Sequence, residues 1–242
     1  MKKYYYDFHI HSCLSPCADD ENTPFNIAGM AKLCGLDMIA LTDHNSCKNC
    51  PAFFKACENY GIIPIAGAEV TTAEDIHVIC LFENPESALE FDSELQSHRT
   101  LIENRTDIFG NQYIYGEDDS ITDTDKYYLS VATDLSLDEM PVLVSKFGGV
   151  CYPAHIDRQA NGIISVLGTF PDIPEFKIAE INDKDKVEEY TEKYALQDKL
   201  IIISSDAHYL TGIKDKENYI ELDAESGGNE IRHALFEKLR KL

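Results

Sequence analysis

Short apolar runs alternate with amphipathic patterns over the first hundred residues of the chain. Runs rich in aromatic and β-branched residues predict strands over 4–10, 38–41, 62–66 and 76–82. Apolar residues recur at helical spacing from Ile27 to Cys34, after the start signal Thr23-Pro24, and a second helix is predicted over 51–60. The order strand, helix, strand, helix, strand predicts parallel strands joined by right-handed crossovers, and therefore an α/β fold.

The rest of the chain continues this pattern less regularly. Helices are predicted over 85–97, 136–147 and 228–242, the second of them opened by a capping box of Ser136 and Glu139. Strands are predicted over 150–152, 179–181, 200–203 and 219–222. Residues 98–135 lack clear periodicity and include the acidic run 117–125. Such a long irregular stretch is typical of a functional insertion, so we expect one domain over 1–242 with an insertion at about 98–135.

Residues that bind metals follow the predicted strands. His9 and His11 close the first strand and share one face of it, because side chains alternate along a strand. Six of the eight histidines lie at strand ends, together with three acidic residues. The full set is His9, His11, Asp43, His44, Glu69, His77, His155, Asp206 and His208, with His77 at the start of its own strand. In a barrel of parallel strands the carboxyl ends open on one face, so this set predicts a single site there.

This set contains more ligands than one ion needs. Imidazoles and carboxylates bind divalent Zn, Mn and Fe. One site is completed by His9, His11, Glu69 and Asp206, a second by His77 and His155 with Glu69 bridging, and part of a third by His44 and His208. We therefore expect two to three divalent ions, which hold a phosphoryl group and generate hydroxide near neutral pH.

These motifs together resemble the PHP (polymerase and histidinol phosphatase) superfamily. The matching motifs are His9-Ile10-His11, Thr42-Asp43-His44-Asn45, Gly67-Ala68-Glu69, His77, Pro153-Ala154-His155 and Ser204-Ser205-Asp206-Ala207-His208, in the family's order. The resemblance implies a distorted (β/α)7 TIM-like barrel with the inserted segment over its C-terminal face. It also implies a trinuclear centre of Zn, Mn or Fe, and phosphoester hydrolysis on histidinol phosphate, nucleotides or nucleic-acid ends.

One position departs from the family pattern. The family often has a His or Asp five or six residues after the second His of the opening motif, where this chain has Pro16 and Cys17. A Cys17 thiolate is a candidate ligand of the third metal, and it would favour Zn or Fe(II). The alternatives are Asp19 or Asp20 as the ligand, or a vacant third site.

Several further residues are candidates for catalysis or substrate binding. Asp43 is expected behind a metal-bound imidazole, with proton shuttling or loop capping as alternatives. His208 or a metal-bound water is expected to protonate the leaving group. Arg158 is a candidate for binding the substrate phosphate, with a surface ion pair as the alternative. Asn111 and Gln112, in the insertion, are candidates for contacting the substrate.

Structural roles are expected for two other groups. Cys47 and Cys50 are interpreted as loop cysteines, although a Cys-x-x-Cys also occurs as a redox pair or, here with Cys13 and Cys17, as a four-thiolate cluster. Glu180 and Asn182 flank another strand end and are candidates for lining the pocket. For Glu180 a structural role is favoured.

The charge of the chain guides the prediction of its substrate. Lys and Arg number 21 and Asp and Glu 43, which gives a net charge of −22. Because Lys and Arg neutralise nucleic-acid backbones, the expected partner is a small phosphorylated metabolite or nucleotide, not nucleic acid. The alternatives are a 3′–5′ exonuclease-like enzyme, whose basic groove would need Lys48, Lys55, Arg99 and Arg105, and a non-catalytic metal-dependent binding module. The nearly complete ligand set argues against the last.

The compartment is predicted from apolar runs and cysteines. No apolar run approaches the roughly 20 residues of a membrane span, so no membrane partner is expected. Cys34, Cys57, Cys80 and Cys151 lie in apolar patterns, as reduced core thiols do. We predict a cytoplasmic protein, and no pattern in the sequence indicates its oligomeric state.

Overall fold

A computed structural model describes residues 1–225 and 227–242 of the chain. Its strands are β1 (Lys2–Ile10), β2 (Met38–Leu41), β3 (Ile63–Thr71), β4 (His77–Phe82), β5 (Tyr113–Tyr115), β6 (Ile121–Thr124), β7 (Val150–Pro153), β8 (Ile178–Ile181), β9 (Leu200–Ile203) and β10 (Tyr219–Leu222). Its α-helices are α1 (Pro24–Leu33), α2 (Cys50–Tyr60), α3 (Pro85–Leu95), α4 (Thr106–Phe109), α5 (Met140–Lys146), α6 (Ile163–Leu167), α7 (Val187–Lys193) and α8 (Gly228–Arg240). Short 3₁₀ turns lie at Gln96–His98, Lys184–Lys186 and Leu210–Gly212.

The first three strands are parallel, as predicted from the alternation of strands and helices. β1 pairs with β2, and β2 pairs with β3, both in parallel register. One extra residue in β1, between Asp7 and Ile10, forms a bulge against β2. A bulge bends its strand and changes the direction of the side chains that follow, which here are those of the His-x-His motif.

β4 departs from the expected parallel arrangement. It pairs antiparallel with β3 on one side and with β7 on the other, so no helix separates β3 from β4. The short turn 72–76 that joins β3 to β4 leaves no room for a crossover, which a parallel strand would need. A regular (β/α)7 alternation is therefore not what the described chain adopts. The reversal also explains why His77, at the start of its strand, lies beside residues that end theirs.

The strands curl into a half-barrel. Six of them follow the order β10-β1-β2-β3-β4-β7, and the parallel pair β8–β9 lies beside them. The Ile156 amide donates to the Glu180 carbonyl at 2.9 Å, next to the ends of β7 and β8. On the other side, Ile10 and Ala207 form a parallel bridge between the end of β1 and the chain after β9. Residues 9 and 206 are therefore brought close together in space.

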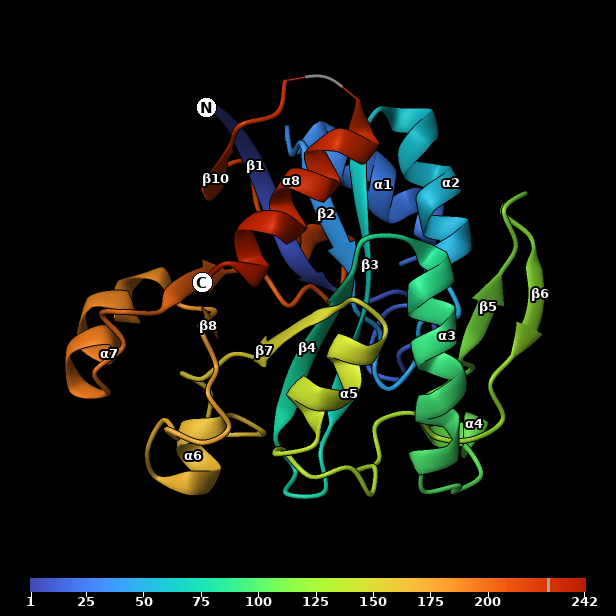
Figure 1. The fold of residues 1–242 in the computed structure, drawn as a ribbon. Coiled ribbons are helices and arrows are strands. Elements are labelled where there is room, and N and C mark those ends of the chain that lie inside the picture. Colours follow the sequence, from blue (N-terminus) through green and yellow to red (C-terminus); the bar gives the residue numbers. More distant parts are fainter. Residues whose placement is uncertain (226) are drawn as a thin grey trace.

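Apolar side chains fill three regions around this sheet. The concave interior contains Phe8, Met38 and Tyr152 and is closed by Leu235 and Phe236 of α8. α1 and α2 cover β1 and β2 on the outside, and α2, α3 and α5 cover β3 and β4. Figure 1 shows α1, α2 and α3 along one side of the sheet and α8 across it. The interior that α8 closes lies away from the strand ends that carry the predicted metal ligands.

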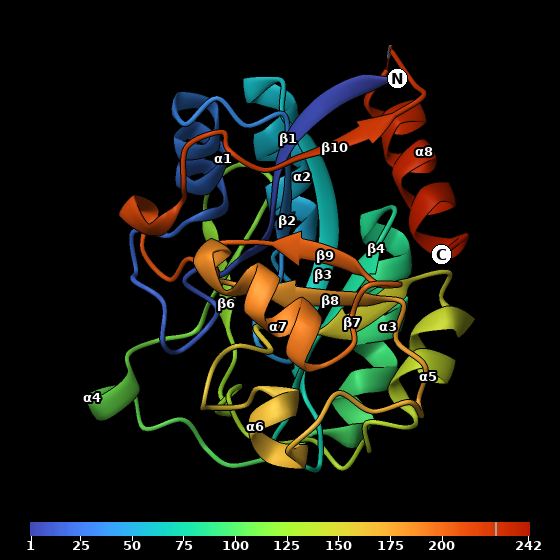
Figure 2. The same cartoon turned by 90° about the vertical axis from the view of Figure 1, so that its left-hand side faces the viewer.

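Residues 98–135, which we call the 98–135 segment, contain α4 and the antiparallel hairpin of β5 and β6. Its two ends meet, because Arg99 and Thr133 form an antiparallel bridge and the Asp134 amide donates to the His98 carbonyl at 3.0 Å. In Figure 2 the arrowheads of β8 and β9 point toward the side on which β6 and α4 lie.

Four helices differ from the prediction. The Ser136–Glu139 capping contacts form, with the Ser136 amide 2.8 Å from a Glu139 carboxylate oxygen, but α5 begins only at Met140. α4, α6 and α7 were not predicted. α7 has no buried residue, so it lacks the apolar stripe on which helix prediction depends, and α6 is only five residues long. Within the described residues, no helix has the length and apolar character needed to cross a bilayer.

Candidate metal centre

Four predicted ligands meet at the end of β1. The Nε2 atoms of His9 and His11 lie 3.0 Å apart, and each lies 3.1 Å from Oδ1 of Asp206. Glu69 completes the group, with its oxygens 3.3 Å from His9 and 3.4 Å from His11. All four side chains are buried, and together they form one of the clusters able to hold a metal ion. Ligands from β1, β3 and the chain after β9 therefore surround one point.

Glu69 also reaches a second group of imidazoles. Its Oε1 lies 2.8 Å from Nδ1 of His77 and 3.0 Å from Nε2 of His155, while its Oε2 lies 3.0 Å from Nδ1 of His44. His44, Glu69 and His77 form another cluster able to hold an ion. The two oxygens of one carboxylate thus face two neighbouring sites, which is the geometry of a bridging ligand.

A third cluster lies beside these two. It contains His11, His44 and His208, from three separate strand ends. Cys17 approaches from the exposed side, with its Sγ 3.2 Å from Nε2 of His44. Given metal–ligand distances of about 2.0 Å for nitrogen and 2.3 Å for sulfur, two ligands of one ion lie roughly 3.0–3.5 Å apart. The spacing of Cys17 and His44 fits that range.

Strong electrostatic coupling holds this centre together. Burial alone would lower the pKa of His11, but Asp206 and Glu69 raise it to about 9. Burial would also lower the pKa of His44, but the carboxylate of Glu69 raises it to about 9. Burial would raise the pKa of Glu69, yet His77, His9 and His44 hold it well below its ordinary value. Burial and the charge of His11 lower the pKa of His208 to about 3.

Hydrogen bonding gives a second reason, besides the types of residue present, to expect divalent metal ions here. Two buried atoms that face the centre, Asp206 Oδ1 and His44 Nδ1, have no well-aligned hydrogen bond, although imidazole or carboxylate atoms lie 3.0–3.1 Å from them. The facing Nε2 atoms of His9 and His11 lie in contact in a water-poor site. Unpartnered buried polar groups are costly, whereas an ion between these lone pairs would satisfy several of them at once.

Two carboxylates stand behind the first two histidines. Glu180 of β8 lies with Oε1 2.8 Å from Nδ1 of His9. Asp43 accepts a hydrogen bond from the Ser15 hydroxyl at 2.7 Å, and Ser15 in turn lies 2.9 Å from Nδ1 of His11. Such partners orient a metal-binding imidazole and fix its tautomer. Asp43 therefore acts on His11 through Ser15, not directly on the cluster.

The sequence did not predict that Glu180 positions a metal ligand. The favoured interpretation gave it a structural role, and the structure places it fully buried against His9. A usable signal was present. A carboxylate within the apolar run of β8 must be paired when buried, and the unpaired histidines of the strand ends were the available partners.

Some of the strained backbone lies at the centre. Of the seven non-glycine residues with positive φ in the described chain, Asn45, His155 and Asp206 lie here, with φ values of 47°, 26° and 52°. Non-glycine residues rarely do so unless the surrounding structure enforces it, and such residues gather at functional sites. The turns at three strand ends are thus bent to aim ligand side chains inward.

Arg158 lies at the edge of the centre, and the two candidates from the insertion lie elsewhere. A guanidinium nitrogen of Arg158 contacts Asp206, while the side chain stays 44% exposed. Gln112 is fully buried, donates to the Asp125 and Tyr127 carbonyls and accepts from the Leu129 amide. The expectation that Gln112 binds substrate is therefore wrong, because its amide is consumed in holding the segment. Asn111 is exposed and donates to the Tyr113 hydroxyl.

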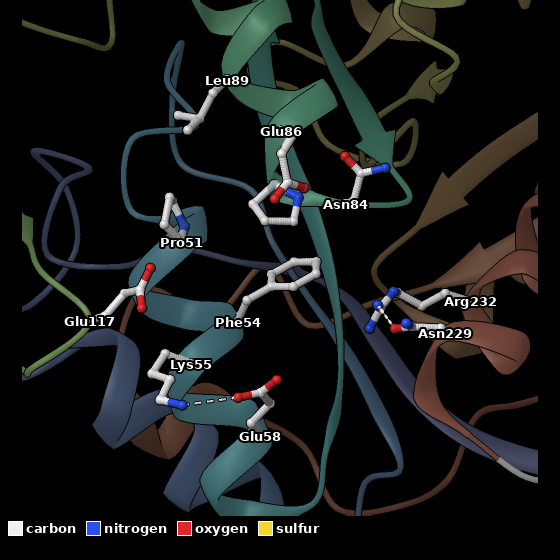
Figure 3. A pocket seen from close by; sticks show the side chains of 11 residues that line it. Pro51, Phe54, Lys55, Glu58, Asn84, Glu86, Leu89, Glu117, Asn229 and Arg232 are labelled. Atoms are coloured by element: carbon white, nitrogen blue, oxygen red, sulfur yellow. Dashed lines mark hydrogen bonds and ion pairs between the residues drawn. The ribbon is translucent and has the colours of Figure 1, made fainter.

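The cysteines beyond Cys17 stay apart from the metal clusters. Cys47 and Cys50 are free and buried among apolar side chains, and burial raises the pKa of Cys47 well above its ordinary value. A four-thiolate site is absent from the metal-binding groups of the described residues. A surface cavity of about 660 Å³, lined by Phe54, Asn84 and Arg232 among others, contains no residue of the metal centre (Figure 3).

The cations predicted to form a basic groove are each held by a carboxylate. Lys48 lies 2.7 Å and Arg99 3.0 Å from the same oxygen of Asp125. Arg105 lies 2.7 Å from Asp107, and Lys55 lies 3.2 Å from Glu58. These four residues therefore do not supply a strip of free positive charge.

Comparisons with known proteins agree with this geometry. The model of the PHP domain family matches residues 7–210. No curated protein matches the sequence. Endonuclease Q of Pyrococcus furiosus, a lesion-specific endonuclease, superposes on 100% of the chain with a TM-score of 0.66 at 16% identity. A protein of Bifidobacterium adolescentis, provisionally described as a metal-dependent phosphoesterase, superposes on 84% of the chain and 87% of its own length, with a TM-score of 0.57 at 19% identity.

A second structure of Endonuclease Q contains a 27-mer duplex with an abasic lesion at the active site, and it matches 100% of the chain with a TM-score of 0.64 at 15% identity. The chain spans 56–57% of the length of Endonuclease Q. These matches contradict the prediction that the substrate is a small phosphorylated molecule and not nucleic acid. That prediction assumed that the net charge of the whole chain also describes the site. The carboxylates of the centre face histidines, so the net charge of the whole chain does not describe the site.

Proposed function

The chain belongs to the PHP domain family, a family of metal-dependent phosphoesterases, and on this premise we propose that it hydrolyses a phosphodiester bond of nucleic acid. The observation that carries this proposal is Glu69, whose two oxygens lie within 3.4 Å of imidazoles from both adjoining clusters. Multinuclear centres bridged in this way suit in-line displacement at phosphorus. The likeness to Endonuclease Q supports the class of substrate.

We assign the first ion to His9, His11, Glu69 and Asp206, and the second to Glu69, His77 and His155. A third is assigned to His44, His208 and Cys17, with zinc or ferrous iron favoured by the sulfur ligand. Divalent ions in these sites would polarise a phosphoryl oxygen and lower the pKa of water.

The remaining residues position the imidazoles or bind the substrate. Glu180 holds the ring of His9, and Ser15 with Asp43 holds that of His11. Arg158 is paired with Asp206 and 44% exposed, and we propose that its planar guanidinium exchanges this partner for non-bridging phosphate oxygens when substrate binds. His208 shares a cluster with His11 and His44, and we therefore assign it to metal binding.

The experiment uses the purified chain stripped of metal and reloaded with Mn²⁺, Zn²⁺ or Fe²⁺. End-labelled single strands, intact duplexes and duplexes with one abasic site are offered as substrates, together with a panel of small phosphomonoesters. We expect metal-dependent cleavage of at least one nucleic acid, with loss of activity in EDTA. Cleavage of the small phosphomonoesters alone, or of nothing, would refute the proposal.

Two further arms sharpen this experiment. A circular single strand distinguishes internal cleavage from attack at an end. Elemental analysis of the wild type and of Cys17→Ser measures the number of ions, and one ion fewer in the variant is expected if the thiolate is a ligand. An unchanged count would remove Cys17 from the third site.

A further inference from the structure

The 98–135 segment exposes several large apolar side chains to solvent. Leu101, Ile102, Ile108, Phe109 and Ile121 have exposed fractions of 57%, 52%, 59%, 40% and 52%. Exposed apolar side chains that cluster in one segment mark contact surfaces more often than singly scattered ones do. The segment lies on the side toward which β8 and β9 point (Figure 2). A molecule bound to this surface would therefore lie on the side of the protein to which these two strands point.

Two aromatic rings of this surface form a pair. The ring centroids of Phe109 and Tyr128 lie 4.4 Å apart, with their planes inclined by 36°. Phe109 ends α4, where Gly110 turns the chain with φ 72° and its carbonyl accepts from the Asn104 side chain at 2.9 Å. The Tyr128 amide donates to the Ile102 carbonyl at 2.8 Å. The pair is thus held from both sides while the Phe109 ring stays partly open to solvent.

The Tyr128 side of this pair lies near the loops that carry predicted metal ligands. Asn45, the residue after His44, donates from its side chain to the Leu129 carbonyl at 2.6 Å and to the Val131 carbonyl at 2.9 Å. These bonds fix the chain directly after Tyr128 against the loop that carries a predicted ligand. The pKa of Tyr128 is raised by burial and by the charge of Cys17, whose sulfur contacts His44.

Most of the nearby cations are paired with carboxylates. Lys48 and Arg99 both contact Asp125, and Arg105 contacts Asp107, whereas the exposed Lys126 lies 4.8 Å over the ring of Tyr127. Phosphate contacts could then come from the metal centre, Arg158 and Lys126, and the bases of the strand would need contacts of another kind. Aromatic side chains provide such contacts, because every base has a π-face on which they stack.

We infer that Phe109 and Tyr128 form a stacking subsite for one unpaired base of the strand whose phosphate lies at the metal centre. This inference rests on the proposed function and narrows it. The enzyme would act on a strand that is single-stranded, or locally opened, next to the scissile bond. A fully paired base cannot offer a free face to these rings without leaving its stack.

Binding is measured first, without any need for turnover. A short single strand carries the fluorescent base 2-aminopurine at successive positions, and its emission is followed as wild-type protein is added. We expect quenching at one position only. Phe109→Ala and Tyr128→Leu should weaken binding of that strand roughly 5- to 150-fold, the range expected for loss of one stacked base. Ile108→Ala is the matched control, since it removes exposed apolar surface from the same helix without removing a ring.

A substrate lacking one base provides the second arm. Removing the base at the quenched position should weaken binding to the wild type about as much as Phe109→Ala does. It should add nothing further in that variant, because both changes remove the same contact. Metal content and circular dichroism of each variant establish that fold and centre are intact.

The outcomes separate this inference from the function on which it rests. Nucleic acid that is cleaved by the wild type but bound equally by wild type and Phe109→Ala refutes the subsite and leaves the function standing. Base-specific quenching without any metal-dependent cleavage refutes the function and leaves the subsite standing. No quenching at any position overturns the subsite outright.

Discussion

The metal centre and the 98–135 segment differ in how far apart in sequence their contacting residues lie and in how deeply their side chains are buried. In the centre, imidazoles from β1, from β4 and from the chain after β2 and β7 converge on Glu69 of β3, and these contacts join residues far apart in sequence. In the segment, many contacts are local, such as Arg105 with Asp107 and Ser120 with Asp118, and large apolar side chains face solvent. Under the proposed function, this difference assigns the reaction to the buried strand ends and substrate recognition to a surface segment.

The two regions meet through asparagines. Asn45 binds the carbonyls of Leu129 and Val131, and Asn49 accepts from the Tyr115 amide at 2.8 Å and donates to the Tyr113 carbonyl at 3.1 Å. Both asparagines lie in the loop after β2 that carries His44. If the two regions act independently, changes in the centre should abolish cleavage of every substrate. Changes in the segment should alter only local order and binding.

The largest effect is expected from Glu69→Gln. Glu69 lies within 3.4 Å of five imidazoles, so removing its charge weakens every site that shares it. We expect loss of at least one ion per chain and a fall in kcat of about 10³-fold or more. Elemental analysis and single-turnover cleavage measure the two effects. The exposed Glu90→Gln on α3 is the control, and a fully loaded, active Glu69→Gln protein would contradict the assignment.

A smaller loss is expected from Glu180→Gln. An amide in place of the carboxylate keeps the shape but weakens the hydrogen bond that orients His9, and such partners are worth roughly 10- to 100-fold in metal affinity. Competition with a coloured chelator measures the affinity, with the exposed Glu188→Gln on α7 for comparison. Unaltered affinity would return Glu180 to a purely structural role.

The metal-free protein should lose stability as the pH rises. The pKa of His11 and of His44 is raised to about 9 in the folded chain, against about 6.5 when unfolded. A raised pKa contributes stability that is complete below about pH 6.5 and is lost as the pH approaches 9, on the order of a few kcal/mol. Urea midpoints of the metal-free protein between pH 6 and 9.5 test this. A flat or rising midpoint over that interval would disprove it.

The smallest and most local effect is expected from Gln112→Ala. The variant loses three hydrogen bonds inside the 98–135 segment and none at the centre. Hydrogen exchange over residues 98–135 should quicken, while metal content stays that of the wild type. The exposed Gln197→Ala serves as the reference. Loss of metal in Gln112→Ala would mean that the two regions are not separable.

The sequence predicts the centre better than the segment, for a physical reason. His9, His11, Glu69, His155 and Asp206 are found because strand ends of an α/β fold share one rim, and that rule needs only the order of strands. The antiparallel direction of β4 was not predicted, because periodicity carries no information on strand direction. The burial of Gln112 was also missed. It depends on carbonyls of residues 125 and 127, whose positions no local pattern specifies.

The meeting of the two ends of the 98–135 segment has a consequence for the history of this chain. Because Arg99 bridges Thr133 and His98 pairs with Asp134, the excursion leaves and rejoins the sheet at nearly one point. A segment attached in this way can change in length while the strands on either side of it keep their places. Under the proposed function, exchange of this one contiguous stretch would alter substrate preference, provided that the new stretch keeps the hydrogen bonds to Asn45 and Asn49 that hold the loop of His44.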